Sequence, residues 1–346
     1  MSKNILQTVI GIGFKKQAVL QTASTAADVW RLSKLNAALA VVNPTNEDDA
    51  NEIGKGHEFA ENIFKVNMDA SGSIEKYISS EMMAWLFAMA FGKVTEVAAG
   101  SGYKLTMVPS GVCDPLDLPP FTFVEQIKCP TSDAAVDRAS VGNVISDFTL
   151  AIGSGPTRAN AKFTANFHGC GKVNQPSAIV VPSPALAEHL LPASSAAVSI
   201  LGTDYVTSKN LVSLEFSANN NPRLDQGFFP GSGVDSNGYA IRGRMERGNR
   251  AFGLGTVARF DAGSTELTNL LALTTGTATF SLTGALISTG FYHKLLVTFH
   301  KVALKSAQLA DDQGIVTVAT QISPMFDATD GVITVEVTTG ITGIGQ

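Results

Sequence analysis

The chain has 346 residues, of which 45% are hydrophobic and 16% are charged, and its formal net charge is −5. This balance is typical of an ordered globular protein and excludes a disordered one. The mild negative charge argues against a dedicated nucleic-acid-binding surface, which needs concentrated basic side chains. The 32 glycines, together with many serines and threonines, favour β-structure with tight turns. The length suits two domains or one large one.

The cysteines and the N-terminus indicate the cellular compartment in which the chain folds. Cys113, Cys129 and Cys170 are odd in number and lack metal-site spacing, so a reduced compartment is the simplest interpretation. Residues 1–17 have no cleavage site after a proper apolar region. No apolar run approaches the roughly 18 residues of a membrane span. We therefore expect a protein that folds in a cytoplasm and makes no membrane contact.

Residues 61–92 are the stretch around which the rest of the chain is organised. Apolar and polar residues alternate from Phe64 to Met68, which predicts a strand, and Asp69–Gly72 supplies turn residues. Ser79 suits a helix N-cap, and Gly92 suits the left-handed residue that ends a helix. Met82, Trp85, Leu86 and Met89 lie between them at helical spacing. The sequence predicts a helix over 79–91 that covers an open side of a β-structure.

The segment 43–61 is polar and acidic and follows the turn signal Asn43-Pro44. A connection of this length is either a solvated loop or a functional contact, and both interpretations stay open. If it is a contact between subunits, its candidate residues are Glu47, Asp48, Asp49, Glu52, Lys55 and Glu58. The preceding stretch Val29–Leu39 fits a helix or a strand equally well.

Strands follow the helix. The alternating stretches are Tyr103–Val108, Phe121–Ile127, Val144–Ile152 and Ala161–Phe167. Residues 153–158 predict a hairpin turn between the last two. Four prolines among small residues make 174–197 a predicted linker, which separates a domain at 1–173 from one at 198–346.

The second half repeats the first in outline. A long loop at 218–238 follows the strand Leu211–Phe216, and a strand ending at 255–261 precedes a predicted helix at 264–275. Ser264 is its expected N-cap, with Leu267, Leu270 and Leu271 on one face. The closing strands are Leu295–Ala303, Ile315–Ile322 and Val332–Thr338, of which the last two form a predicted terminal hairpin. The predicted fold is mainly β, with two tandem β-sandwich or barrel domains, each flanked by one short α-helix.

Motifs for chemistry are missing from the sequence. Three Gly-x-Gly stretches, at 11–13, 153–155 and 231–233, lack the continuation of a phosphate loop. No Gly-x-Ser-x-Gly elbow is present. The five histidines, His57, His168, His189, His293 and His300, show no ligand spacing. We therefore expect no catalytic, cofactor-binding or metal site, and a protein that is not an enzyme.

One basic cluster lies at 241–250 and holds Arg242, Arg244, Arg247 and Arg250. Such a cluster binds phosphate, or it pairs with carboxylates of a neighbouring subunit. The acidic segment 47–61 offers matching charge, so a subunit contact is the favoured interpretation. Arg223 and Asp225, in the loop before the cluster, are further candidates for contacts between subunits or rings.

This order of elements resembles the tail tube proteins of long-tailed bacteriophages. The resemblance is carried by Ile53-Gly54-Lys55-Gly56 at the end of the acidic loop, the strand into residues 69–74, the helix Met82–Phe91 closed by Gly92, and the strands at 103–106, 120–123 and 142–167. The loop at 219–233, the strand at 243–247 and the closing strands look like a second copy.

The resemblance implies a structural role. Subunits of the family join edge to edge into rings, and the rings stack into a hollow tube that conducts DNA without binding it specifically. Two copies in one chain imply three chains per ring with pseudo-sixfold symmetry. The implied partners are further copies of the chain, the tail terminator and the tail tip. Whether a sheath is a further partner stays open. The implied location is the virion tail, after assembly in the host cytoplasm.

Several expectations follow for such a tube. Acidic and small polar side chains should line the lumen, and the helices should lie outside the barrel on its sheet. Loops 43–61 and 218–238 should contact the adjacent ring. The main alternative is another virion or surface β-protein, such as a capsid decoration or adhesion module. A carbohydrate-active enzyme is a third reading, which Trp30 and Trp85 support weakly.

Overall fold

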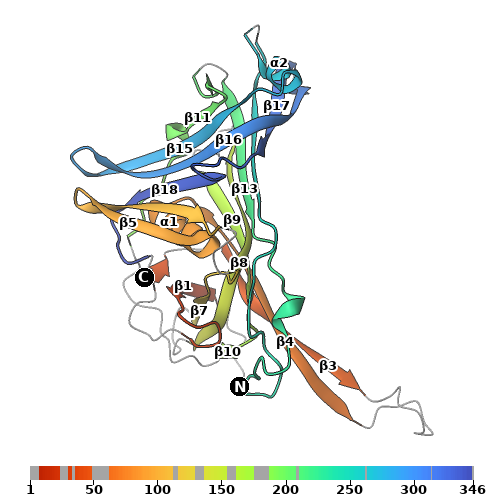
Figure 1. The fold of residues 1–346 in the computed structure, drawn as a ribbon. Coiled ribbons are helices and arrows are strands. Elements are labelled where there is room, and N and C mark those ends of the chain that lie inside the picture. Colours follow the sequence, from red (N-terminus) through yellow and green to blue (C-terminus); the bar gives the residue numbers. More distant parts are fainter. Residues whose placement is uncertain are drawn as a thin grey trace.

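The computed structural model describes residues 8–23, 30–32, 36–48, 62–111, 116–128, 136–153, 161–174, 187–207, 210–261, 263–312 and 314–344. These ranges fold into antiparallel strands and a few short helices (Figure 1). None of the helices in them is long and apolar enough to cross a membrane.

The elements up to the predicted linker are mostly strands. They are β1 (Thr8–Lys16), β2 (Trp30–Leu32), β3 (Asn36–Asp48), β4 (Ile63–Tyr77), α1 (Ser80–Phe91), β5 (Gly92–Ala99), β6 (Gly102–Pro109), β7 (Phe121–Lys128), β8 (Val136–Gly153), β9 (Lys162–Gly169) and β10 (Val173–Asn174).

The remaining elements are also dominated by strands. They are the 3₁₀ turn η2 (Ala193–Ser195), β11 (Ala197–Ile200), β12 (Thr203–Asp204), β13 (Leu211–Asn219), the 3₁₀ turn η3 (Asp225–Gly227), β14 (Ala251–Arg259), α2 (Glu266–Leu271), β15 (Thr275–Ser288), β16 (Phe291–Asp312), β17 (Ile315–Pro324) and β18 (Ile333–Thr339).

A long antiparallel sheet, which we call the main sheet, runs through both halves of the chain. Its strands follow the order β3, β4, β9, β8, β13, β14, β17 and β16. The ladder between β8 and β13 joins the two predicted halves, with Asn219 opposite Asp147 and Ser213 opposite Gly153. The last strand contributes its C-terminal part, from Val302 to Asp312.

A second layer covers one face of the main sheet. The N-terminal part of β16 pairs with β15 and β18, β18 pairs with β6, and β6 pairs with β5. Strand β7 pairs with both β1 and the N-terminal part of β8. The two layers enclose α1, which contacts β5, β6, β8, β16 and β18.

The ends of α1 confirm the sequence prediction. The Ser79 side chain accepts a hydrogen bond from the Met82 amide, and Gly92 ends the helix with a left-handed φ of 84°. All 12 residues of the helix are buried, so it lies inside the core instead of burying one stripe alone.

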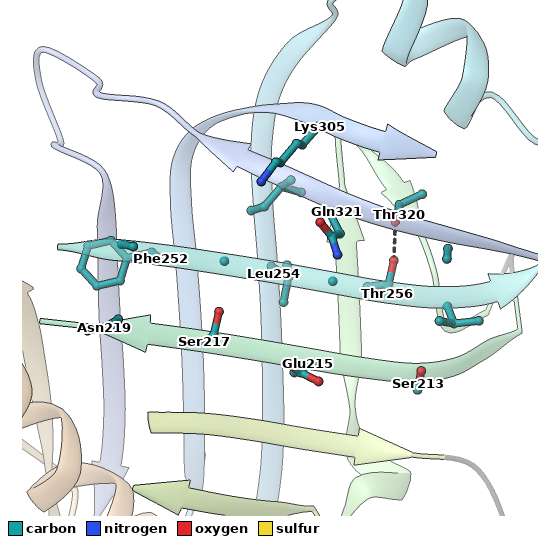
Figure 2. Close-up of a pocket in the computed structure, with 16 residues that line it drawn as sticks. Ser213, Glu215, Ser217, Asn219, Phe252, Leu254, Thr256, Lys305, Thr320 and Gln321 are labelled. Carbon is teal, nitrogen blue, oxygen red and sulfur yellow. Dashed lines mark hydrogen bonds between the residues drawn. The ribbon is translucent and has the colours of Figure 1, made fainter. Parts of the chain in front are cut away.

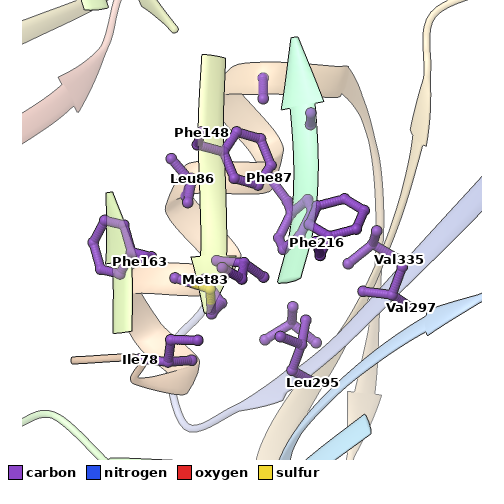
Figure 3. Close-up of a cluster of buried hydrophobic side chains, with 14 of the residues drawn as sticks. Ile78, Met83, Leu86, Phe87, Phe148, Phe163, Phe216, Leu295, Val297 and Val335 are labelled. Carbon is purple, nitrogen blue, oxygen red and sulfur yellow. The ribbon is translucent and has the colours of Figure 1, made fainter. Parts of the chain in front are cut away.

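Aromatic rings on α1 tie the two halves together. The Phe87 ring lies 5.1 Å from that of Phe148 on β8 and 5.9 Å from that of Phe216 on β13. Figure 3 shows these rings packed with Val297 and Val335 from β16 and β18. A single cluster of buried side chains extends from Phe14 to Ile344. The halves therefore share one hydrophobic core.

Two predicted turns lie inside strands. Asp69–Gly72 belongs to β4. The glycine serves close packing instead of a turn, because a Cβ at position 72 would lie 2.4 Å from the Phe167 ring. Asn43-Pro44 belongs to β3, which pairs with β4. A strand at a sheet edge tolerates a proline, which has no N–H, because no strand on its outer side needs a backbone hydrogen bond from it. The ambiguous stretch at 29–39 contributes strand residues to β2 and β3.

The second half departs from its prediction in three places. Residues 243–247, predicted as a strand, lie in the irregular segment between β13 and β14. Helix α2 begins after Thr265 and ends at Leu271, and Ser264 instead accepts a hydrogen bond from the Asp261 amide. Strands β17 and β18 do not close the chain as a hairpin, because each pairs with a different part of the long strand β16. The predicted hairpin of β8 and β9 is confirmed by their ladder, and its turn at 154–160 lies outside the described residues.

The ladders reveal a repeated irregularity. The ladder of β8 with β9 shifts between Ile145 and Asp147, and that of β16 with β17 shifts between Leu304 and Ser306. Each bulge adds one residue, Ser146 or Lys305, to the longer strand. The counterpart of the β8–β9 pair in the second half is therefore the β16–β17 pair.

We predict that Phe87→Ala lowers the free energy of unfolding by about 3–5 kcal/mol, because it leaves a cavity among rings from both halves. Chemical denaturation followed by circular dichroism measures the loss. Leu271→Ala, at an exposed position of α2, is the control and should change stability by less than about 0.5 kcal/mol. Unfolding in two separate transitions would contradict the shared core.

Candidate functional site

One face of the main sheet is polar, while the other faces the core. Cross-strand neighbours share a face in an antiparallel sheet, so a row of residues can be followed from strand to strand. One such row crosses seven strands and consists of Tyr77, Lys162, Ala151, Glu215, Gly255, Gln321 and Ser306. A neighbouring row consists of Glu75, Thr164, Thr149, Ser217 and Gly253. We call this surface the polar face.

A shallow groove runs along the polar face over β13, β14 and β17. Figure 2 shows Ser213, Glu215 and Ser217 on one side of it and Lys305 and Gln321 on the other. Two glycines of β14, Gly253 and Gly255, line its floor. The groove therefore forms where residues without side chains leave space between the longer side chains on either side.

The charges on the polar face are of both signs. Glu75 and Lys162 form an exposed ion pair of 3.6 Å between neighbouring strands. Glu215 and Lys305 line the same groove, and Asp147 accepts a hydrogen bond of 2.7 Å from the Asn166 amide. The charged residues named here include both carboxylates and ammonium groups and form no concentrated basic patch, so they provide little attraction for a polyanion.

Both ends of the main sheet have unpaired edges. Within the described residues, β3 pairs with β4 alone, and the part of β16 beyond Leu304 pairs with β17 alone. Leu309, on the second of these edges, is 60% exposed. Exposed strand edges are templates for pairing with another chain.

An apolar surface surrounds α2. Leu267 and Leu271 on the helix are 59% and 77% exposed, and only Leu270 of its predicted apolar face packs against the core. Four more exposed apolar side chains belong to this α2 surface: Leu273 follows the helix, Leu309 lies on β16, which contacts α2, and Phe260 and Val316 are joined by a backbone hydrogen bond. A cluster of exposed large apolar side chains marks a protein–protein contact.

Eight of the predicted contact residues lie in the described part of the chain, and five of these are exposed. Glu47 and Asp48 are exposed at the end of β3, and Arg223, Asp225 and Arg244 are exposed in the segment between β13 and β14. Asp49, Glu52, Lys55 and Glu58 lie outside the described residues.

Arg242 makes its contacts within the chain. It is buried, and its guanidinium donates hydrogen bonds to Asp69 on β4 (2.5 Å), to the Gly169 carbonyl (3.0 Å) and to the Leu224 carbonyl (3.0 Å). The bonds to Asp69 and Gly169 fasten the segment 220–250 to the main sheet.

Arg247 and Arg250 also bind backbone of the first half. Arg247 donates to the Gly111 carbonyl, and Arg250 donates to the Ser110 carbonyl at 3.2 Å and to the Ser110 hydroxyl at 3.1 Å. Burial, with a smaller contribution from the nearby Arg247, lowers the pKa of Arg250 to about 10. The guanidinium thus stays charged at neutral pH.

Of the cysteines, Cys170 is buried, and burial raises the pKa of its thiol. Cys113 and Cys129 lie outside the described residues.

The fold is mainly β, and the outer strands of its polar-faced main sheet each pair with one neighbour among the described residues. The family model for phage tail tube proteins matches residues 8–338, nearly the whole chain. The chain therefore belongs to the phage tail tube protein family and is a structural component of the virion tail. None of the curated proteins compared with it matches.

We predict that Asp69→Asn destabilises the fold by about 1–3 kcal/mol, because it leaves the buried Arg242 guanidinium without its carboxylate. Urea titration of the two proteins measures the difference. The control Glu75→Gln removes an exposed ion pair and should cost less than about 0.5 kcal/mol. Equal effects of the two variants would contradict the anchoring role of Arg242.

Proposed function

We propose that this chain builds the wall of the tail tube: three chains join edge to edge into a ring, and rings stack into a tube that delivers DNA to the host. The role is structural and without catalysis. The observation that carries the proposal is the β8–β13 ladder, since it joins two similar halves as neighbouring chains would be joined.

The halves correspond strand by strand. The first contributes β3, β4, β9 and β8 to the main sheet, and the second contributes β13, β14, β17 and β16 in the same order of pairing. A helix follows β4 and β14 alike, and both closing pairs carry a bulge at the same place. This supports a duplicated unit, with the domain boundary in the segment 174–197.

The correspondence predicts a register for the junction between chains. Asp147 and Ser306 are the first residues after the two bulges. Followed across two ladders, the row of Asp147 reaches Ser73 on β4, and the row of Ser306 reaches Gly255 on β14. Four residues before Ser73, Asp69 of β4 pairs with Asn43. Four residues before Gly255, Ala251 of β14 pairs with Asn219. Since Asn219 lies opposite Asp147 inside the chain, Asn43 of one chain should lie opposite Ser306 of the next.

A disulfide tests this register. The double variant Asn43→Cys with Ser306→Cys places thiols at a cross-strand pair, where Cα atoms lie about 4.5–5.5 Å apart, within disulfide range. After oxidation of assembled tubes, non-reducing electrophoresis should show a ladder that ends at three linked chains. That limit also tests the ring size.

Two controls bound the result. The parent chain with its native cysteines reports background oxidation. The pair Thr45→Cys with Gln308→Cys lies on the same strands but four residues out of register, about 13 Å apart by strand geometry, and should not link. Equal linking of both pairs would reject the register, and a ladder that ends at another number would reject rings of three.

The α2 surface is the second proposed contact. Helix α1 is enclosed by strands of both halves, with β16 and β18 contributed by the second half, whereas α2, at the matching position, exposes its leucines. In a ring, the next chain would cover α2 as the second half covers α1. Association would then remove an apolar surface from water.

We predict that Leu271→Lys blocks tube formation and leaves the monomer folded, because this side chain is exposed in the monomer. Negative-stain electron microscopy scores tubes, and circular dichroism scores folding. Leu271→Met keeps the position apolar and should assemble. Normal tubes from Leu271→Lys would remove α2 from the interface.

The polar face would then line the lumen, where short side chains and charges of both signs let DNA pass without specific binding. The hairpin of β3 and β4 projects from the body (Figure 1). Its tip, with Glu47 and Asp48, is proposed to contact the adjacent ring together with Arg223, Asp225 and Arg244. The terminator and tail tip are the proposed end partners, with assembly in the host cytoplasm.

A further inference from the structure

Three side chains from distant segments converge beside the start of α1. Glu81 lies in the first turn of the helix, His189 lies in the described C-terminal part of the predicted linker, and His293 lies near the start of β16. Among the described residues, each offers one ligand atom, and these atoms all lie within 4.8 Å of one another. We propose that they bind one zinc-class transition-metal ion.

The carboxylate is already oriented for this role. Its Oε2 accepts a hydrogen bond of 2.8 Å from the His189 backbone amide, and its Oε1 faces both imidazole rings. An ion would replace the hydrogen bond between Oε1 and His189 Nδ1 and the bond of 2.7 Å between the Ser80 hydroxyl and His293 Nδ1. From Oε1, Nδ1 of His189 lies at 2.8 Å and Nδ1 of His293 at 3.6 Å. Ligand atoms about 2.0–2.1 Å from a tetrahedral ion are roughly 3.3 Å apart, so the two distances lie on either side of the required value.

Burial gives the cluster a closed side and an open side. The side chains of Glu81 and His293 are 1% and 3% exposed, whereas that of His189 is 41% exposed. The rings are stacked, with centroids 3.8 Å apart. His189 can therefore tilt to direct its nitrogen at an ion, and solvent on its open side supplies a fourth ligand.

The segment that carries His189 is held in place independently of an ion. The amides of Ser80 and Leu191 donate to the carbonyls of His189 and Ile78, at 3.1 and 2.9 Å. Lys76 and Glu188 form a buried ion pair beside them. A ligand set that is supported in this way loses little conformational entropy on binding.

The donor set selects the class of ion. Two imidazole nitrogens and one carboxylate oxygen suit Zn²⁺ and its neighbours, whereas Mg²⁺ and Ca²⁺ prefer oxygen ligands alone. The buried carboxylate also offsets part of the charge of the ion. A bound ion would fasten the segment 187–191 to both α1 and β16.

Metal-free monomer prepared with a chelator is the protein to test. Titration calorimetry with ZnCl₂ should show one site per chain with micromolar or tighter affinity. Co²⁺ should give the visible absorption of a four-coordinate site. His189→Ala should weaken Zn²⁺ binding at least tenfold and abolish the rise in melting temperature that Zn²⁺ gives the parent chain.

The control variant is His300→Ala on the same strand as His293. His300 is hydrogen-bonded to Thr334 and lies outside the cluster, so its loss should leave the affinity unchanged. His189→Gln keeps a polar side chain at the position and serves if His189→Ala misfolds. Absence of stoichiometric binding at 1 mM ZnCl₂ (about a thousandfold above the expected dissociation constant), or equal weakening by His189→Ala and His300→Ala, would overturn the proposal.

Discussion

The ladder between β8 and β13 is the contact on which the rest of the structure depends. It makes two similar four-stranded units into one continuous sheet and places Phe148 and Phe216 on the same side of it, where Phe87 packs against both. Without this ladder each half would expose an additional strand edge. The same pairing provides the pattern for the proposed contact between chains, because the outer edges of the main sheet belong to the corresponding strands.

The two helices show how burial depends on neighbours. Both follow the second strand of a unit, yet α1 is wholly buried and α2 exposes leucines that its sequence placed on an apolar face. The difference arises because strands of the second half cover α1, while no described part of the chain covers α2 in the same way. An amphipathic pattern predicts that a face is covered without identifying what covers it.

Local signals predicted local structure well. The N-cap at Ser79 and the left-handed Gly92 located α1 because their effects act within one helical turn. Turn signals were less reliable. Gly72 is a turn residue by type, yet it lies within β4, where the Phe167 ring of a strand almost a hundred residues away leaves no space for a Cβ. The closing hairpin was wrong because strand patterns do not specify which strand is the partner.

The sequence by itself determined that the chain is mainly β, where α1 lies, and the order of elements that resembles phage tail tube proteins, because composition, alternation and caps are properties of neighbouring residues. Only the tertiary structure decided the order of strands in the main sheet, the burial of Arg242 against Asp69, and the meeting of Glu81 with two histidines that show no ligand spacing. Arg242 and Asp69 are 173 positions apart, and Glu81 and His189 are 108 apart. Neighbouring strands of the main sheet, such as β4 and β9, are also distant in the sequence. Such contacts arise from packing that no local pattern encodes.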